Sequence, residues 1–191
     1  GKTTLLQVLS GVVRLSEGRV LLDGTDYYSV ENREEEGRKG EQNSRDDRRK
    51  RDGFPGIGVI IENSSLYPQL SGFQNLKFLA QMRGVIGDEE IKEAIAAMGL
   101  DPDDKRPFRK YSLEMKQRLL MAQAVMEEPA FLFLDEPVNA MDAEGIRLVR
   151  EQLSRTAGRG AVILRDSRRR EDIQLLCDEI YWLQDGKIME K

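Results

Sequence analysis

The sequence contains no histidine in its 191 residues. This absence excludes histidine-ligated metal sites, Ser-His-Asp triads and histidine general bases. Cysteine is nearly absent too, and the single Cys177 cannot form an internal disulfide. No start methionine or secretory signal precedes Gly1, so we expect a reducing, cytosolic setting.

Long apolar runs and an excess of positive charge are also missing. The longest apolar stretches, at residues 130–134 and 161–164, are far shorter than the roughly 20 residues of a membrane-spanning helix, and they predict buried strands. The net charge of -4 argues against a protein that mainly binds nucleic acid through its phosphates. With 39% apolar and 34% charged residues, the composition is that of one soluble globular domain.

Residues 31–52 form a mixed-charge run with almost no apolar side chain, which cannot fold by itself. The run is either a regulatory or nucleic-acid-binding insertion or a solvated surface loop. Its acidic and basic residues nearly balance, which weakens the binding interpretation and favours a surface loop.

Elsewhere the apolar spacing alternates between helical and strand periods, the pattern of an α/β fold. We expect helices at residues 2–11, 75–83, 88–98, 113–126, 143–153 and 173–176. We expect strands at residues 19–22, 57–61, 130–134 and 161–164, and a closing hairpin at 180–188. Asp88 and Ser112 are the predicted N-caps of the third and fourth helices, because short polar side chains accept hydrogen bonds from free N–H groups there.

The opening residues Gly1-Lys2-Thr3-Thr4 have the sequence of the end of a phosphate-binding loop. Backbone N–H groups at a helix N-terminus attract an anion, and a lysine adds a positive charge. We predict that Lys2 contacts the β- and γ-phosphates, that the Thr3 hydroxyl ligates Mg²⁺, and that Thr4 reaches a phosphate. Four residues are weak evidence alone, so a second motif has to support them.

That support is Phe-Leu-Phe-Leu-Asp-Glu-Pro at residues 131–137, an apolar strand that ends in two carboxylates. Open α/β sheets bind ligands at the carboxyl ends of their strands. We predict that Asp135 holds Mg²⁺ through water and that Glu136 orients or deprotonates the attacking water. The alternative is a surface Asp-Glu pair after a core strand.

Three segments together resemble the ATPases of ABC transporters: Tyr-Ser-Leu-Glu-Met-Lys-Gln-Arg-Leu at 111–119, Leu-Asp-Glu-Pro at 134–137 and Asn-Ala-Met-Asp at 139–142. In that family they correspond to the signature motif, Walker B and the D-loop, and residues 1–4 to the end of Walker A. The resemblance extends over nearly the full chain. It implies that Ser112, Glu114 and Asp142 also contribute to ATP binding.

Glu62 stands where most members of the family carry the Q-loop glutamine, so the resemblance implies catalytic and Mg²⁺-binding roles for it. A glutamate there resembles the branch of bacitracin- and lantibiotic-type exporters, whose pattern recurs as Ile-Glu at 61–62 and Tyr-Pro-Gln-Leu at 67–70. By the same comparison we expect the start of the Walker A loop, the first strands and the adenine-stacking aromatic residue to lie upstream of this sequence.

The implied fold is α/β: a P-loop NTPase (RecA-like) core with a parallel sheet, a partial antiparallel β subdomain and an inserted α-helical subdomain. The core comprises residues 1–61 and 120–191, and the helical subdomain residues 62–119. The implied cofactors are ATP and Mg²⁺. The implied partners are a second nucleotide-binding domain, joined head to tail, and a transmembrane permease subunit at the inner face of the cell membrane. No nucleic acid partner is expected.

Two residues depart from the family pattern. Glu114 replaces a signature glycine, and a carboxylate about 4 Å from a phosphate is repelled by on the order of 4 kcal/mol at an effective dielectric near 20, unless its side chain turns away. Arg168 occupies the position of the H-loop histidine. It is either a cation that senses the γ-phosphate, which we place among the catalytic residues, or part of a solvated run of arginines at 168–170.

These departures leave two functions open. The first is an active exporter ATPase, and the second is a degenerate ATP-binding module, within a heterodimer, that turns over weakly or not at all. A third class, the soluble ABC proteins of DNA repair or translation, would need a long coiled coil or a second copy of the domain. The sequence contains neither feature.

Overall fold

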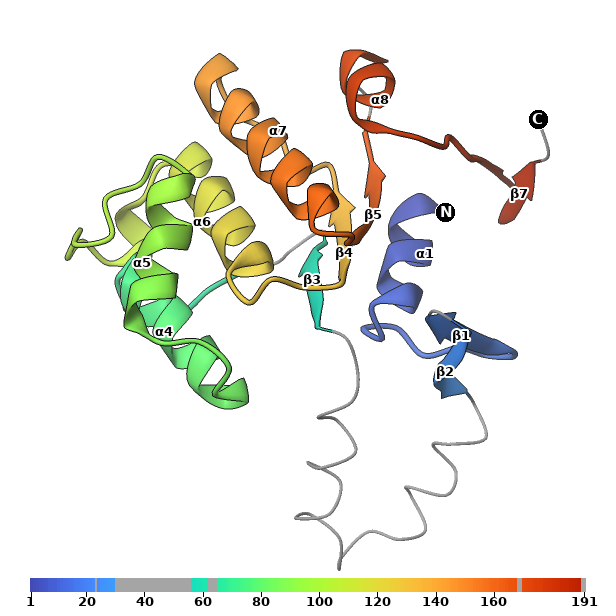
Figure 1. Cartoon of the computed structure of the whole chain (residues 1–191), viewed down its shortest axis with the longest axis horizontal. Coiled ribbons are helices and arrows are strands. Elements are labelled where there is room, and N and C mark those ends of the chain that lie inside the picture. The colour runs from blue at the N-terminus through green and yellow to red at the C-terminus, as the bar shows by residue number, and fades with distance from the viewer. Residues whose placement is uncertain (23, 30–55, 62–64, 168–169, 190–191) are drawn as a thin grey trace, which may run out of the picture.

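The computed structural model describes residues 1–22, 24–29, 56–61, 65–167 and 170–189. The charged run at 31–52 lies outside these ranges, as do Glu62 and Arg168, so what the sequence predicts for them stays a prediction. The described chain combines a parallel sheet with helices on both sides of it (Figure 1). None of its helices has the length and apolar character that a membrane crossing requires.

The central sheet has three parallel strands within the described residues. Their order is β3 (Ile57–Ile60), β4 (Phe131–Asp135) and β5 (Val162–Asp166). The three strands consist mainly of β-branched, leucine and phenylalanine residues, which suit a pleated sheet. The parallel pairing predicted from these continuous apolar runs is confirmed.

Two small antiparallel hairpins accompany the central sheet. One pairs β1 (Arg19–Leu22) with β2 (Thr25–Ser29), and the other pairs β6 (Trp182–Gln184) with β7 (Lys187–Met189). Asp185 and Gly186 turn the second hairpin with φ of 49° and 76°. Two positive φ values are what a two-residue hairpin turn of the favoured twist needs, so the predicted closing hairpin is confirmed.

Helices cover the two faces of the sheet. Helix α1 (Lys2–Leu9) packs against β4 and β5, whereas α6 (Leu113–Val125) packs against β3 and α7 (Ala143–Gly158) against β5. The remaining elements are α4 (Gly72–Arg83), α5 (Asp88–Ala97), the 3₁₀ turn Phe108–Lys110 and α8 (Arg170–Leu176). In Figure 1, α4 and α5 lie beside α6 at the end of the molecule opposite α1, so they extend the layer that α6 begins.

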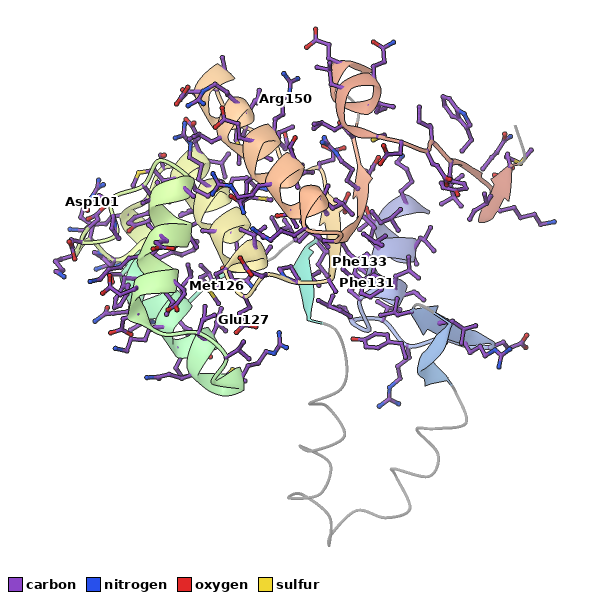
Figure 2. All side chains as sticks on the ribbon, in the orientation of Figure 1. Asp101, Met126, Glu127, Phe131, Phe133 and Arg150 are labelled. Atoms are coloured by element: carbon purple, nitrogen blue, oxygen red, sulfur yellow. The ribbon has the colours of Figure 1, made fainter. Side chains whose placement is uncertain are left out.

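The side chains of β4 alternate between two apolar cores. Leu132 and Leu134 are fully buried in the larger core, which is built mainly by α4 to α7. Phe131 and Phe133 belong to the smaller core with Leu6 of α1, and Figure 2 shows both on the side of the sheet toward α1. This period-two alternation gives β4 one face toward α1 and the opposite face toward the larger core.

Gly58 is the closest contact between the sheet and α6. A β-carbon added at this glycine would lie 2.0 Å from the carbonyl oxygen of Ala124 and 2.7 Å from Leu132 Cδ1. No side chain fits such a gap, so glycine is required here for α6 to rest directly on β3.

In the 72–97 segment the first helix begins earlier than the predicted residue 75, and the second has another cap than predicted. Helix α4 starts at Gly72, because the Ser71 hydroxyl accepts a hydrogen bond from Gln74 N while the Gln74 side chain accepts one from Ser71 N. Asp88 is not the N-cap of α5 but its first residue, and Gly87 is the cap. A Glu90 side-chain oxygen accepts a hydrogen bond from Gly87 N, so the backbone N–H of the capping residue has a partner.

The strand predicted at 161–164 is present as β5, but the prediction that it is buried is wrong. In β5 the side chain of Val162 is exposed and the others are only half buried, because β4 is the strand's only neighbour within the described residues. The helix predicted at 143–153 continues to Gly158, since Leu153 and Thr156 extend its buried stripe by a further turn.

Candidate functional site

The carboxyl ends of β4 and β5 carry two acidic residues side by side. Asp135 ends β4 and stands in register with Asp166, which ends β5. Neighbouring strands are about 4.8 Å apart, and both residues are partly buried, so the edge concentrates negative charge. Asp166 is a residue of this edge that the sequence analysis missed. Its position as the last residue of an apolar parallel strand, like that of Asp135, was the signal that could have found it.

Lys2 brings the balancing positive charge to this edge. As the first residue of α1, it extends its Nζ to 3.7 Å from Asp166 Oδ2. The lysine side chain is 58% exposed, whereas that of the aspartate is 11% exposed. The ion pair is therefore anchored on the sheet side and open to solvent on the helix side, where another anion can compete for the lysine.

The N-terminus of α1 faces the same region. Gly1 precedes the helix and its carbonyl accepts from Leu5 N at 3.0 Å, while Thr3 and Thr4 stand in the first turn. The first N–H groups of a helix have no partner within it, and the helix dipole makes this end positive. Lys2 adds a full charge, so the end of α1 is suited to bind phosphate oxygens.

The oxygen donors here suit Mg²⁺ in kind but not in number. The Thr3 hydroxyl and the Asp135 carboxylate are oxygen ligands of the type that Mg²⁺ takes. Within the residues that the structure describes, no group of three or more acidic, cysteine or histidine side chains is placed to hold a metal. If Mg²⁺ binds here, Thr3 and Asp135 would supply two of its oxygen ligands, and water or a bound ligand would supply the others.

Glu136 follows β4 in an uncommon backbone conformation. Its φ is 45°, in the left-handed region where a side chain costs roughly 1–2 kcal/mol, and its carbonyl accepts from Asn139 N at 3.1 Å. The residue is half buried. The chain therefore makes a tight turn directly after Asp135, and Glu136 lies in this turn and not in the strand.

The N-terminus of α6 is capped as predicted. The Ser112 hydroxyl accepts a hydrogen bond from Met115 N at 3.1 Å, which satisfies one of the free donors of the first turn. Ser112 itself is exposed. The remaining free N–H groups of this turn form a second positive helix end, distinct from that of α1.

Glu114 does not present an unpaired carboxylate at this helix end. Its oxygen accepts from Nε of Arg118 at 3.0 Å, one turn further along α6. The repulsion expected from the sequence assumes an isolated negative charge, and the arginine removes that assumption. The i, i+4 spacing of a glutamate and an arginine on a helix is the sequence signal that could have revealed this pair.

Asp142 joins the same group from α7. Its carboxylate caps α7 by accepting from Gly145 N at 2.7 Å, and it also accepts from Nη2 of Arg118 at 3.1 Å. The hydrogen bond from Gly145 and the contacts around Arg118 hold the pKa of Asp142 below its ordinary value. Glu114, Arg118 and Asp142 thus form one connected cluster at the N-termini of α6 and α7.

The predicted site residues therefore lie in two groups. Lys2 and Asp135 lie at the sheet edge, with Thr3, Thr4 and Glu136 next to them in the chain, whereas Ser112, Glu114 and Asp142 lie at the starts of α6 and α7. Between them, Gln117 Nε2 donates to the carbonyl of Pro137 at 3.4 Å, which ties α6 to the turn that follows Glu136.

Comparisons with known proteins identify the family of this chain. Residues 1–139 match the family described as ABC transporter. The chain is 38% identical, over 98% of its length and 77% of the relative's, to the uncharacterized ABC transporter ATP-binding protein YybJ of Bacillus subtilis. It is 33% identical to the lantibiotic transport ATP-binding protein SrtF of Streptococcus pyogenes, over 99% of this chain and 72% of SrtF. It spans only 56% and 55% of the length of two further curated relatives.

Among solved structures, the dimeric structure of MJ0796, a bacterial ABC transporter cassette, superposes with a TM-score of 0.77. The alignment covers all of this chain and 79% of that one, at 18% sequence identity. At this identity the likeness concerns the fold, and it confirms the P-loop cassette architecture predicted from the motifs.

Proposed function

Since this chain belongs to the ABC transporter ATP-binding family, as its motifs predict, we propose that it is the ATPase subunit of an exporter for peptide or antibiotic-type cargo. In this proposal it binds and hydrolyses Mg-ATP at a head-to-tail dimer interface and drives a membrane partner. The observation that carries the proposal is the position of Lys2, at a positive helix end beside the acidic carboxyl ends of β4 and β5.

Each residue at the sheet edge has a defined role in this proposal. Lys2 and the N–H groups of α1 bind the β- and γ-phosphates, with Gly1 and Thr4 beside them. Thr3 and Asp135 hold Mg²⁺, which offsets phosphate charge when bound. Glu136 accepts a proton from the attacking water or orients it. Glu62 and Arg168, outside the described residues, retain their proposed places near Mg²⁺ and the γ-phosphate.

The second nucleotide-binding domain completes the site in this proposal. Ser112 and the start of α6 offer exposed N–H groups to the ATP held by the opposite subunit, and Asp142 lies beside them. Support comes from the dimeric structure of the cassette MJ0796. The repulsion between Glu114 and a phosphate is one of two arguments for the degenerate alternative. The pairing of Glu114 with Arg118 weakens that argument.

Phosphate release by the full-length protein tests the proposal. Steady turnover of ATP that depends on Mg²⁺ supports the active enzyme. Nucleotide binding without phosphate release would instead establish the degenerate module. Copurification with ribosomes or DNA, and with no integral membrane subunit, would overturn the transporter assignment.

The membrane partner has a suitable docking surface on α4. Phe78, Met82 and Val85 are exposed along this helix and its end, and Tyr67 packs edge to face on Phe78 with ring centroids 5.2 Å apart. Contiguous exposed apolar side chains of this kind mark interaction sites. We assign the surface to a permease, since SrtF is described as a transport protein, and this contact holds the chain at the inner face of the membrane.

Replacing both Phe78 and Met82 by aspartate is expected to abolish recovery of the permease with this subunit. The charges prevent burial of the apolar surface, while ATP turnover by the separate subunit stays within about twofold, because neither residue is buried in the core. Affinity purification from detergent-solubilised membranes measures the association. Leu175→Asp on α8 is the control at an exposed apolar residue outside this surface, and equal loss of permease with it would contradict the assignment.

Asp166→Ser is expected to raise the affinity for Mg-ATP by about two- to fivefold, because Lys2 then has no internal anion to leave. The gain is small since the lysine is more than half exposed and its ion pair is screened by water. Isothermal titration measures it, with Asp103→Asn in the exposed loop after α5 as the control. Affinity that falls in Asp166→Ser would show that Asp166 assists binding.

A further inference from the structure

The side chain of Arg118 is enclosed by its own helix α6, by the end of α5 and by the start of α7. Its side chain is 13% exposed, although arginine is normally a surface residue. A β-carbon at Gly99, after α5, would lie 3.0 Å from Arg118 Nη1, and one at Gly145, in α7, would lie 3.1 Å from Nε. The guanidinium therefore lies between the end of α5 and the start of α7, where it leaves too little room for a side chain at Gly99 or Gly145.

The enclosed guanidinium holds two carboxylates from different helices. It donates from Nε to Glu114 of α6 and from Nη2 to Asp142 of α7. A Glu114 oxygen lies 3.0 Å from the position of a β-carbon at Gly145, so this carboxylate rests against the first turn of α7. The positive end of α7 thus stabilises a carboxylate that belongs to α6.

We infer that Arg118 is a positioning residue that draws Glu114 toward α7, away from the phosphate-facing end of α6. We name the group of Glu114, Arg118 and Asp142 the Arg118 clasp. The inference rests on the proposed function, since the phosphate in question belongs to the ATP of the opposite subunit. Because Glu114 is held in the clasp, its carboxylate is not free next to the N–H groups beside Ser112 when they bind an anion. A glutamate is therefore compatible with the signature segment.

The clasp also borders the turn that carries Glu136. Gln117, the neighbour of Arg118, donates to the carbonyl of Pro137, while Arg118 itself reaches Asp142. Helix α6 thereby contacts the segment from Glu136 to Asp142 near its start and at its end. Loss of Arg118 is expected to free both carboxylates and to loosen one of these two attachments.

A charge-rescue experiment tests the inference. In a Glu136→Gln background, which retains ATP, Arg118→Met is expected to raise the ATP concentration for half-maximal dimerisation about tenfold or more, because Glu114 is then unpaired. Glu114→Gln alone is expected to shift it less than Arg118→Met does, because Arg118 already pairs with that carboxylate in the clasp. The double variant recovers most of the loss, since residue 114 then carries no charge and Asp142 keeps its hydrogen bond from Gly145 N. Dimer mass is measured by light scattering.

The controls separate the clasp from general stability and from the proposed function. Arg147→Met breaks an exposed ion pair with Glu144 on α7 and is expected to leave dimerisation unchanged. Arg118→Met that remains defective when Glu114 is neutralised, at an unchanged melting temperature, would overturn the clasp. A parent that forms no ATP-dependent dimer would overturn the proposed function, and with it this role of Arg118.

Discussion

Glu136→Gln is expected to lower ATP turnover by about 10²–10⁴-fold while leaving nucleotide binding within a few-fold of the parent. The amide has nearly the same shape as the carboxylate but cannot accept a proton from water. In the proposed function, phosphate binding depends on Lys2 and the end of α1, which the substitution does not change. Phosphate release and equilibrium titration of Mg-ATP, both on the full-length protein, measure the two effects separately.

The matched control is Glu93→Gln, which makes the same chemical change at an exposed position of α5. Its turnover is expected to equal that of the parent. Turnover in Glu136→Gln within about threefold of the parent would remove Glu136 from the proposed chemistry, since a general base contributes far more than this. The candidate base would then have to be sought outside the turn after β4.

Gly58→Ala is expected to destabilise the fold by about 3 kcal/mol or more, because the new methyl group would overlap the carbonyl of Ala124 at 2.0 Å. Backbone cannot move aside as a side chain can, so β3 and α6 must separate and open the larger core. For a chain of this size the melting temperature should fall by about 10 °C. Thermal unfolding followed by circular dichroism measures the change.

Gly158→Ala is the control for this substitution, since a β-carbon there meets nothing within 4 Å and its φ is not positive. It is expected to leave the melting temperature unchanged or slightly higher, because alanine favours a helix more than glycine does. If Gly58→Ala melts at the same temperature as Gly158→Ala, α6 does not rest on β3 as closely as the structure has it.

Elements with strong local signals were predictable from the sequence. The apolar run that forms β4 and the serine that caps α6 both specify their structure through neighbouring residues alone. The start of α4 depends on a reciprocal pair between Ser71 and Gln74, which a search for apolar spacing does not detect. The exposure of Val162 depends on how many strands flank β5, and no local pattern contains that information.

The candidate site divides in the same way. The positions of Lys2 and Asp135 were predictable because each belongs to a short motif beside a helix or strand end. Asp166 and Arg118 act through partners far away in the sequence, Lys2 for the first and Asp142 for the second. Glu114 shows the cost of judging a residue alone, since its charge suggested repulsion until its partner was known.

Fold stability and the proposed catalytic role make opposite demands on Glu136, because its backbone is left-handed. With φ at 45°, this position favours glycine, so replacing Glu136 by glycine would relieve backbone strain and stabilise the folded chain. The same change would delete the proposed base. A screen that selects variants of this protein for heat resistance alone should therefore enrich Glu136→Gly, and a screen that also requires ATP turnover should eliminate it.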